Sequence, residues 1–264
     1  MQARRSGPIV RLRHDEGWSI PADRPFYPSL PAYYRKVRSQ LVFFQVEPAS
    51  VAEFLPEPLE PAEDGMCLAC GMTVPFCSNY GPFDEAFIEL KCKFRGEPGW
   101  YVSHVFHNGP AGIAAGREIY GTPKLYAHLN VMQEQGIMTT EVQLAGQSII
   151  SITSSMERAS VLGDLPSLSP SWRLKLIPRA DSPRPAIKQL IDGSQALQDL
   201  TVHLMLQGSG ATQFLPTPVC GLSHLKPQRY LRAFYMETSY TETFGKIIYD
   251  YLNNSSAAVS IVSS

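Results

Sequence analysis

Short runs of β-branched, aromatic and other apolar residues recur along this 264-residue chain, and turn residues separate them. Such runs are typical of β-strands. We expect strands at 39–46, 66–76, 86–94, 100–107, 128–132, 139–144, 148–154, 172–177, 202–206 and 230–237. The turn sequence at 95–99 predicts that two of them form an antiparallel hairpin. Helices are expected only at 48–55 and 241–252, so the pattern predicts an antiparallel, β-rich α+β or barrel-like fold.

The chain divides by composition into three parts. Residues 1–35 are rich in Arg, Pro and Tyr, which predicts an extended arm lying on the body or on a neighbouring subunit. Residues 36–254 carry the expected strands, and we expect them to form a single domain. Residues 255–264 are mostly Ser, Ala and Val, and we expect them to be disordered.

The charge balance excludes some classes of partner. The chain has 23 basic and 24 acidic residues and a formal net charge of −1, which favours neither nucleic acid nor an anionic membrane. No apolar run approaches the roughly 20 residues that span a bilayer. The basic stretch at 1–5 has no apolar segment behind it, so it does not resemble a secretory signal. These features predict a cytoplasmic protein.

The cysteines and histidines do not predict a metal site. Five cysteines are present, an odd number that argues against a disulfide framework. Cys67 and Cys70 have the spacing of a zinc-binding pair, but on a strand an odd separation points the two side chains to opposite faces. His104 and His107 lack a third ligand at a useful spacing. We therefore expect buried small cysteines and hydrogen-bonded structural histidines.

The stretch 109–127 carries the chemistry that most invites a function. Gly121 permits a turn, and Pro123 fixes the backbone just before Lys124. Apolar residues flank this lysine at Ile113, Ile119 and Leu125. On this pattern alone, Lys124 is either an ordinary solvated surface charge or an amine held in a pocket.

The order Gly116-Arg117-Glu118 and then Pro123-Lys124 resembles the central motif of the acetoacetate decarboxylase superfamily. Three further stretches resemble family segments in the same order, namely 55–60, 174–178 with 182–184, and 248–252. The resemblance covers roughly residues 40–254. It implies a closed, cone-like β-barrel with helices outside and the lysine inside, and it implies a homo-oligomer.

In that family the lysine after the proline forms a Schiff base with a keto acid, so the resemblance assigns this role to Lys124. An amine attacks a ketone only when it is unprotonated, and a lysine has an ordinary pKa of about 10.4. Bringing a lysine pKa to about 7 takes on the order of 5 kcal/mol from burial or a nearby cation. The flanking apolar residues could provide burial. The family places a second lysine next to the first, whereas this chain has Leu125 there.

Two other active-site positions of the family can be compared. Glu85 matches a family glutamate and is expected to act as an acid or base. The decarboxylases carry a further glutamate on the preceding strand, whereas residues 68–71 here contain no acid. Arg38 is the nearest match to a family arginine before the first strand, with Arg35 as a competitor.

Four more side chains are candidates for binding the substrate. A planar guanidinium suits a carboxylate, so Arg117 is a candidate, while Glu118 could either pair with it or face the cavity. The hydroxyl of Tyr120 could serve as an acid or a hydrogen-bond donor. Tyr80, in the turn-rich loop 78–84, is a similar candidate. For the two tyrosines and Glu118, the alternative is a purely structural role.

The expected reaction class is that of a Schiff-base lyase acting on a small keto acid. Because the lysine imine withdraws electrons, neither a metal nor an organic cofactor is required. The first candidate reaction is decarboxylation of a β-keto acid. The second is the reaction of an aldolase-dehydratase or hydratase on a 2-oxo acid such as pyruvate, which the missing glutamate favours. A third reading is a non-catalytic protein that binds a hydrophobic ligand, with an inert, salt-bridged lysine.

Overall fold

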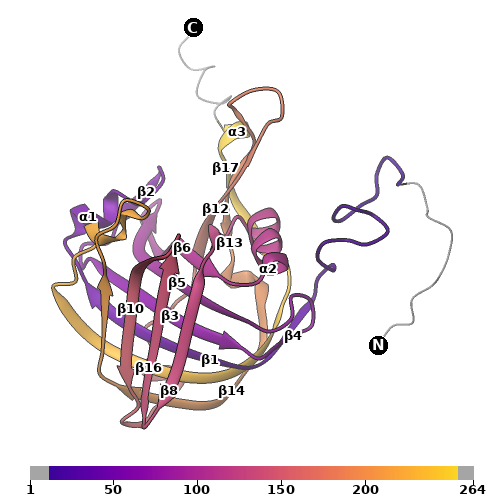
Figure 1. The fold of residues 1–264 in the computed structure, drawn as a ribbon. Coiled ribbons are helices and arrows are strands. Elements are labelled where there is room, and N and C mark those ends of the chain that lie inside the picture. Colours follow the sequence, from indigo (N-terminus) through magenta and orange to yellow (C-terminus); the bar gives the residue numbers. More distant parts are fainter. Residues whose placement is uncertain (1–11, 255–264) are drawn as a thin grey trace, which may run out of the picture.

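A computed structural model describes residues 12–254 as two β-sheets with a few short helices (Figure 1). Within this range the main sheet has 13 strands. Ten of them follow one another in the order β11 (Arg158–Ala159), β14 (Leu197–Gly208), β16 (Arg229–Glu242), β1 (Ala32–Gln45), β3 (Met66–Val74), β5 (Phe83–Phe94), β6 (Glu97–His107), β12 (Ser171–Pro178), β13 (Pro185–Asp192) and β17 (Lys246–Asp250). The other three pair with members of this order: β2 (Leu59–Pro61) with β5, β4 (Phe76–Cys77) with β1, and β7 (Lys124–Tyr126) with β6. The second sheet has the order β15 (Gly210–Phe214), β10 (Gln147–Ser155), β9 (Ile137–Leu144), β8 (His128–Glu134).

The helical segments are short. They are α1 (Pro48–Ala52), α2 (Pro110–Ala115), the π-helical turn η1 (Gly116–Tyr120), the 3-10 turns η2 (Leu162–Asp164), η3 (Ser194–Ala196) and η4 (Gly221–His224), and α3 (Tyr251–Asn254). None of the helices in the described part of the chain has the length and apolar character needed to cross a membrane.

The β-rich, mainly antiparallel fold with few helices confirms the predicted class. Within the described residues, the parallel pairs are β6 with β12 and β6 with β7. The strand order runs from β11 to β17, and these two ends do not pair with each other in the described chain. Closure of the main sheet into a barrel is therefore not confirmed.

The main hydrophobic core lies between the two sheets. Strands β1, β3 and β5 point alternate side chains toward the second sheet, and these pack against apolar residues of β9 and β10. The members from the main sheet include Val42, Phe44, Cys67, Ala69, Ala86, Ile88 and Leu90, and those from the second sheet include Val142, Ile149, Ile150 and Ile152. The remaining side chains of β1, β3 and β5 point to the opposite face, where the candidate site lies.

This alternation separates the two cysteines as the sequence predicts. Cys67 packs in the core between the sheets, whereas Cys70 packs in a different cluster with Leu41 and Met236. Their side chains therefore lie on opposite faces of β3, and they cannot bind one metal ion together.

The helix predicted at 241–252 is wrong. That segment forms the end of β16, then β17, and only the short α3. Strand β17 pairs with β13, with Leu190 opposite Tyr249. Strand β13 was not expected from the sequence, so the segment's pairing partner was missing from the prediction. The predicted helix 48–55 forms but ends at Ala52.

The predicted arm is partly built into the fold. Strand β1 begins at Ala32, inside the arm, and the side chain of Tyr27 is buried and donates a hydrogen bond to Glu118. Trp18 packs edge-on against Tyr27 and Phe244. The first eleven residues of the arm and the tail predicted to be disordered, 255–264, lie outside the described residues.

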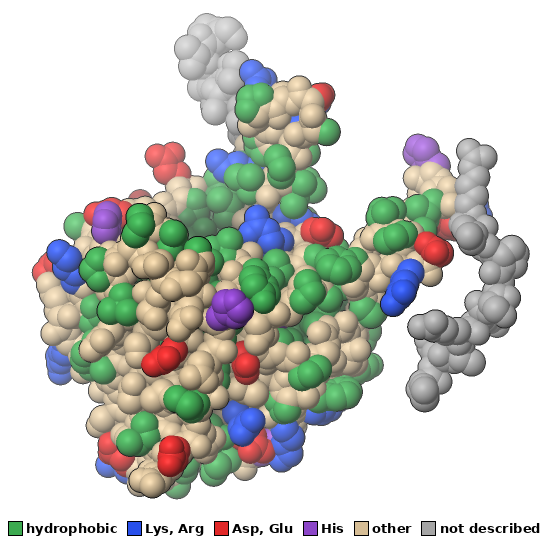
Figure 2. Space-filling model, in the orientation of Figure 1, with side chains coloured by type: hydrophobic (Ala, Val, Ile, Leu, Met, Phe, Trp, Pro, Cys, Tyr) green, Lys and Arg blue, Asp and Glu red, His purple; other side chains and the backbone are tan. Residues whose placement is uncertain are grey.

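The hairpin of β12 and β13 extends beyond the body of the molecule together with β17 and α3 (Figure 1). Figure 2 shows hydrophobic side chains on the surface of this projection. Leu176 on β12 and Ile247 on β17 are among the exposed large apolar residues. The base of the same hairpin contributes Arg173 to the site described next.

Candidate active site

The segment from α2 to β7 delivers Lys124 to a cavity. Pro110 begins α2, and the chain continues into the π-helical turn η1. The turn ends at Gly121, whose φ of +75° is a left-handed conformation that favours glycine. Lys124 then opens β7, beside Val105 of β6. Its side chain lies over Gly116, where an added Cβ would come within 2.7 Å of the lysine Cε.

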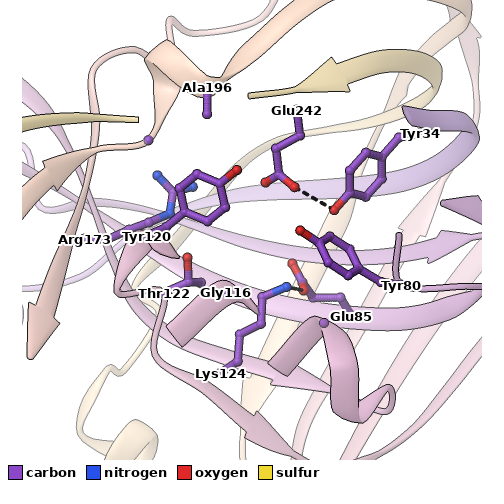
Figure 3. Close-up of a pocket in the computed structure, with 12 residues that line it drawn as sticks. Tyr34, Tyr80, Glu85, Gly116, Tyr120, Thr122, Lys124, Arg173, Ala196 and Glu242 are labelled. Atoms are coloured by element: carbon purple, nitrogen blue, oxygen red, sulfur yellow. Dashed lines mark hydrogen bonds and ion pairs between the residues drawn. The ribbon is translucent and has the colours of Figure 1, made fainter. Parts of the chain in front are cut away.

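Lys124 and Glu85 form an ion pair inside the cavity (Figure 3). The lysine Nζ lies 2.6 Å from the glutamate Oε2, and the exposed fractions of the two side chains are only 13% and 11%. Glu85 lies on β5, opposite Met72 of β3 and His107 of β6. The ammonium group also lies 5.7 Å from the centre of the Phe83 ring. An amine with a carboxylate at this distance can exchange a proton with it directly.

His107 lies behind this pair and is completely buried. Its Nδ1 accepts a hydrogen bond from the backbone N–H of Gly109 at 2.7 Å, so in the neutral ring the proton is on Nε2. Nε2 lies 3.8 Å from Glu85 Oε2 and has no hydrogen-bond partner among the described residues. Burial, with Lys124 nearby, lowers the pKa of His107 to about 4. His107 is therefore a neutral structural residue whose N–H faces the ion pair.

A second carboxyl group enters the cavity from β16. Glu242 Oε2 accepts a hydrogen bond from the Tyr34 hydroxyl at 2.9 Å, and Tyr34 stacks on Tyr240. Burial raises the pKa of Glu242, although Lys124, Tyr34 and Arg173 oppose this effect. Burial likewise raises the pKa of Tyr34 well above its ordinary value. The cavity thus contains an acid that holds its proton more tightly than an exposed glutamate does.

Arg173 on β12 supplies a guanidinium group to the same cavity. It donates a hydrogen bond to the Ser171 carbonyl at 3.2 Å, and no carboxylate of the described residues forms an ion pair with it. The guanidinium lies against Gly193, where an added Cβ would be 1.6 Å from Nη1. Burial raises the pKa of Glu89 and of Glu242, and Arg173 lies near enough to oppose this rise at each without forming an ion pair with either. A guanidinium that faces a cavity in this way is suited to bind a carboxylate ligand.

These groups surround a chamber of about 80 Å³. The side chains and glycines that line it are Tyr34, Tyr80, Glu85, Gly112, Gly116, Tyr120, Thr122, Lys124, Arg173, Gly193, Ala196 and Glu242. Figure 3 shows the lysine amine directed at Glu85, with Tyr80, Tyr34 and Glu242 beyond it and Arg173 with Tyr120 across the chamber. The chamber therefore brings together an amine, two carboxyl groups, a guanidinium and three tyrosines.

Four of the residues predicted from the sequence meet here: Lys124, Glu85, Tyr120 and Tyr80. The Tyr120 hydroxyl already donates to the Thr243 carbonyl at 2.5 Å, which ties it to the fold. The Tyr80 hydroxyl is buried and has no hydrogen-bond partner among the described residues. Tyr80 is therefore the freer of the two to bind a ligand.

The other three predicted residues lie elsewhere. Arg117 and Glu118 are exposed on the outer side of η1, because Gly116 and Tyr120 occupy the side of this turn that faces the chamber. Arg117 Nη1 donates to the Lys124 carbonyl at 3.2 Å, and Glu118 accepts from Tyr27. Arg38 is exposed on β1, on the face opposite the cavity-lining Ser39.

The expectation that flanking apolar residues bury the amine is also corrected at Leu125. Leu125 follows Lys124 on β7 and points away from it, with 42% of its surface exposed. Burial of the lysine comes instead from the chamber walls and from Gly116. Arg173 and Glu242 were not predicted from the sequence. Strand alternation beside the buried Trp172 was a signal that pointed toward Arg173, whereas Glu242 lies in 241–252, which was predicted to be a helix.

Comparison with known proteins shows the family to which the chain belongs. The family model described as "Acetoacetate decarboxylase (ADC)" matches residues 19–252. A curated relative, acetoacetate decarboxylase 1 of Bradyrhizobium diazoefficiens, is 26% identical over 251 residues, which cover 93% of this chain and 99% of that protein.

Solved structures share the fold. Acetoacetate decarboxylase from Legionella pneumophila superposes with a TM-score of 0.80 at 23% identity, covering 92% of this chain and 100% of that one. The enduracididine biosynthesis enzyme MppR, complexed with the condensation product of pyruvate and imidazole 4-carboxaldehyde, gives a TM-score of 0.76 at 19% identity, covering 89% and 97%. With the family model matched over most of its length, this chain belongs to the acetoacetate decarboxylase family.

Proposed function

We propose that this protein is a Schiff-base-forming lyase that acts on a keto acid, with Lys124 as the nucleophile. One observation carries the proposal: the lysine amine lies 2.6 Å from the carboxylate of Glu85 inside an enclosed chamber. Glu85 can take the proton that the ammonium must lose before it attacks a ketone. The amine then adds to the carbonyl carbon, water leaves, and a protonated imine remains.

Arg173 is the proposed partner of the substrate carboxylate. Its guanidinium faces the chamber and has no carboxylate partner in the described chain. A bidentate pair with a carboxylate would hold the keto acid in one orientation, with its ketone toward Lys124. In this proposal Arg173 takes the role that the sequence suggested for Arg117.

The first candidate reaction is decarboxylation of a β-keto acid. Family membership supports it, as does the name of the Bradyrhizobium relative. The bond to the carboxyl carbon breaks, CO₂ leaves, and the electron pair moves into the imine to give an enamine. The enamine carbon then takes up a proton, and Glu242 is placed to give one because burial raises its pKa. Hydrolysis of the imine releases the ketone and restores the amine.

The second candidate is aldol addition and dehydration starting from a 2-oxo acid such as pyruvate. Cys70 lines the cavity on the strand where the decarboxylases carry a further glutamate. Glu242 and Tyr34 form an acid pair that could serve proton transfer at the imine and at a second carbonyl group. MppR, which shares this fold, binds a condensation product of pyruvate with an aldehyde.

Borohydride trapping followed by peptide mass spectrometry tests the imine. Acetoacetate and pyruvate are offered separately to the wild type, to Lys124→Ala and to Lys175→Ala. Lys175 is a matched control because it is half-buried on β12 and does not line the chamber. We expect a stable adduct on the Lys124 peptide in the wild type and in the control, and none in Lys124→Ala.

Product analysis then separates the two reactions. Release of CO₂ from acetoacetate supports decarboxylation, whereas a condensation product from pyruvate and an aldehyde supports the aldol reaction. The proposed function fails if no keto acid gives an adduct and Lys124 reacts with acylating reagents only at the high pH of ordinary lysines. That outcome would leave the non-catalytic, ligand-binding protein.

We also propose that the protein forms a homo-oligomer, as the family resemblance implies. The exposed Leu176 and Ile247 on the projecting hairpin and its neighbouring strand are candidates for a subunit contact. Light scattering after gel filtration measures the mass of the assembly. Leu176→Asp should lower this mass if the projection is part of the contact, and an unchanged mass would exclude it.

A further inference from the structure

The chamber around Lys124 opens into a second, larger cavity of about 270 Å³. Seven residues line both spaces: Tyr34, Glu85, Lys124, Arg173, Gly193, Ala196 and Glu242. The larger space, which we name the extension, therefore begins at the reacting amine. Since the two spaces adjoin at these shared residues, one molecule with its head in the chamber is suited to place its other end in the extension.

The wall of the extension is formed by cross-strand neighbours. Strand pairing sets Met236, Ser39, Met72 and Glu85 in one row across β16, β1, β3 and β5. A second row contains Leu41, Cys70 and Phe87 on β1, β3 and β5. All of these residues line the extension. Because they alternate with the residues of the packed core, they form one continuous surface.

This surface is mainly apolar and well supported from behind. Leu41 is 5% exposed, Cys70 2% and Met236 7%, and all three belong to one hydrophobic cluster. Burial raises the pKa of the Cys70 thiol well above its ordinary value, so this side chain is neutral. The charged groups of the whole space are confined to its chamber end, at Glu85, Lys124, Arg173 and Glu242.

A ligand that matches this distribution has a polar head and an apolar body. Acetoacetate or pyruvate would occupy the chamber and leave the apolar extension to water. Small-molecule sites are in general apolar spaces with a few placed polar groups, and the two spaces together have this character. The apolar area of a longer ligand would leave water on binding beside Leu41, Cys70 and Met236, and this burial would stabilise the complex.

We propose that the extension is a binding subsite for an apolar substituent of several carbon atoms, held next to the carbonyl carbon that reacts with Lys124. This inference rests on the proposed function and adds the substrate class to it. The substituent belongs either to the keto acid itself or to an aldehyde that condenses with it. An apolar substituent on either molecule would make the same contacts in the subsite, and the experiments below distinguish the two molecules.

The first experiment measures binding without imine formation. Isothermal titration with unreactive straight-chain carboxylates, from butanoate to octanoate, reports the subsite directly because these ligands have no ketone. We expect Kd to fall about fourfold for each added methylene, which corresponds to about 0.8 kcal/mol. A Kd that is independent of chain length would overturn the proposal, whatever the outcome of the trapping experiment.

Two variants fill the extension. Cys70→Leu and Ser39→Leu each add volume to the wall, and each should reduce the ratio of octanoate affinity to butanoate affinity by tenfold or more. Ser39 is only half-buried, so this variant keeps the test available if Cys70→Leu does not fold. Cys220→Leu, a cysteine that does not line the cavity, is the control and should leave the ratio unchanged. Equal ratios in all four proteins would overturn the proposal.

The second experiment locates the substituent, using the active wild-type protein. One series uses 3-oxo acids of increasing chain length, and the other uses pyruvate with aldehydes of increasing length. A rise in kcat/KM with the length of the keto acid places the substituent there, and a rise with aldehyde length places it on the second substrate. Imine formation with no dependence on length in either series would overturn the subsite. Absence of any imine would instead refute the proposed function, while the carboxylate titration still decides the subsite.

Discussion

Strands β1, β3 and β5 present two faces that differ in one respect. The face toward the second sheet is filled by side chains. The opposite face is filled by a second hydrophobic cluster over part of its length and is hollow over the rest, where it holds the candidate site. The same strands build both faces, since successive residues such as Cys70 and Gly71 point to opposite sides. On the packed side Gly71 leaves room for Thr140, and an added Cβ would lie 2.0 Å from the threonine Oγ1.

The buried polar groups of the two faces differ in whether they have hydrogen-bond partners. On the packed face, the Gln40 amide donates to the Met138 carbonyl and to Ser154, and it accepts from Thr140. Those buried groups satisfy one another. On the hollow face the Tyr80 hydroxyl has no partner in the described chain, and Arg173 forms no ion pair with a described carboxylate. Unsatisfied polar groups are costly to bury, so a buried hydroxyl without a partner that lines a cavity marks a place where a ligand can bind.

The largest expected effect is on activity, from a change on the hollow face. Glu85→Gln keeps the shape of the side chain but cannot take the proton of Lys124. We expect kcat/KM for the trapped keto acid to fall by about 10²- to 10⁴-fold, with an unchanged circular dichroism spectrum. A rate within a few-fold of the wild type would show that Glu85 is not the base.

His107 connects the hollow face to the stability of the fold. Its pKa is lowered from 6.5 to about 4 by burial and Lys124, against the opposing effect of Glu85. The stability that comes from keeping this ring neutral is fully present above pH 6.5 and is lost as the pH falls toward 4. At about 1.4 kcal/mol per pH unit, the loss is about 3 kcal/mol.

The variant His107→Asn tests this link, because the asparagine oxygen can still accept the hydrogen bond from Gly109. Urea unfolding between pH 7 and pH 4 should show a smaller loss of free energy of unfolding in the variant than in the wild type. His128→Asn, an exposed histidine on β8, is the control and should behave as the wild type. Parallel pH curves for all three proteins would contradict the prediction.

Gly193 tests the position of Arg173 without removing the arginine. An added Cβ would overlap its guanidinium, so Gly193→Ala must displace that group. We expect KM to rise about 10- to 100-fold with a smaller change in kcat, since a hydrogen bond to a charged group contributes about 1.5–3 kcal/mol. The reverse pattern, a lower kcat with unchanged KM, would show that Arg173 does not bind the substrate.

The smallest expected effect is on the free energy of unfolding, from one substitution on each face. Gly71→Ala adds a methyl group to the packed face and should destabilise the protein by about 1–3 kcal/mol in urea unfolding. Cys70→Ala, one residue away, removes one atom from the wall of the hollow face and should change the stability less than Gly71→Ala does. If both cost the same, the hollow face is as tightly packed as the core.

The sequence predicted those parts of the site that lie in one local pattern. Lys124 stands in a motif, and Glu85 lies at the start of an expected strand, and both reach the chamber. Arg117 was predicted from the same motif, but the π-helical turn directs it outward. The side of such a turn on which a residue lies depends on the number of residues per helical turn, and the sequence motif does not reveal this number.

Arg173 and Glu242 could not be assigned from the sequence for different reasons. Arg173 lies on the expected strand 172–177, where a shift of one residue in register would exchange the two faces. Glu242 lies in 241–252, which was predicted to be a helix, whereas it is the last residue of β16. The register of β12 depends on its pairs with β6 and β13, and the sequence analysis did not include β13. It was therefore predictable that side chains alternate between the two faces of a strand. Which of them face the chamber could be learned only from the tertiary structure.

The position of Arg173 at the base of the projecting hairpin has an evolutionary consequence. Strand β12 pairs with β6 only at Ser171 and Trp172, and beyond these residues it leaves the body of the molecule. Glu85 is carried by β5, on the other side of β6 from β12. Lys124 is carried by β7, which lies on the same side of β6 as β12 but pairs with a separate stretch, at Val105 to His107. In the proposed function, changes in the hairpin can therefore alter which acids bind, while Lys124 and Glu85 stay in place on other strands. Selection can act on the two parts as separate modules.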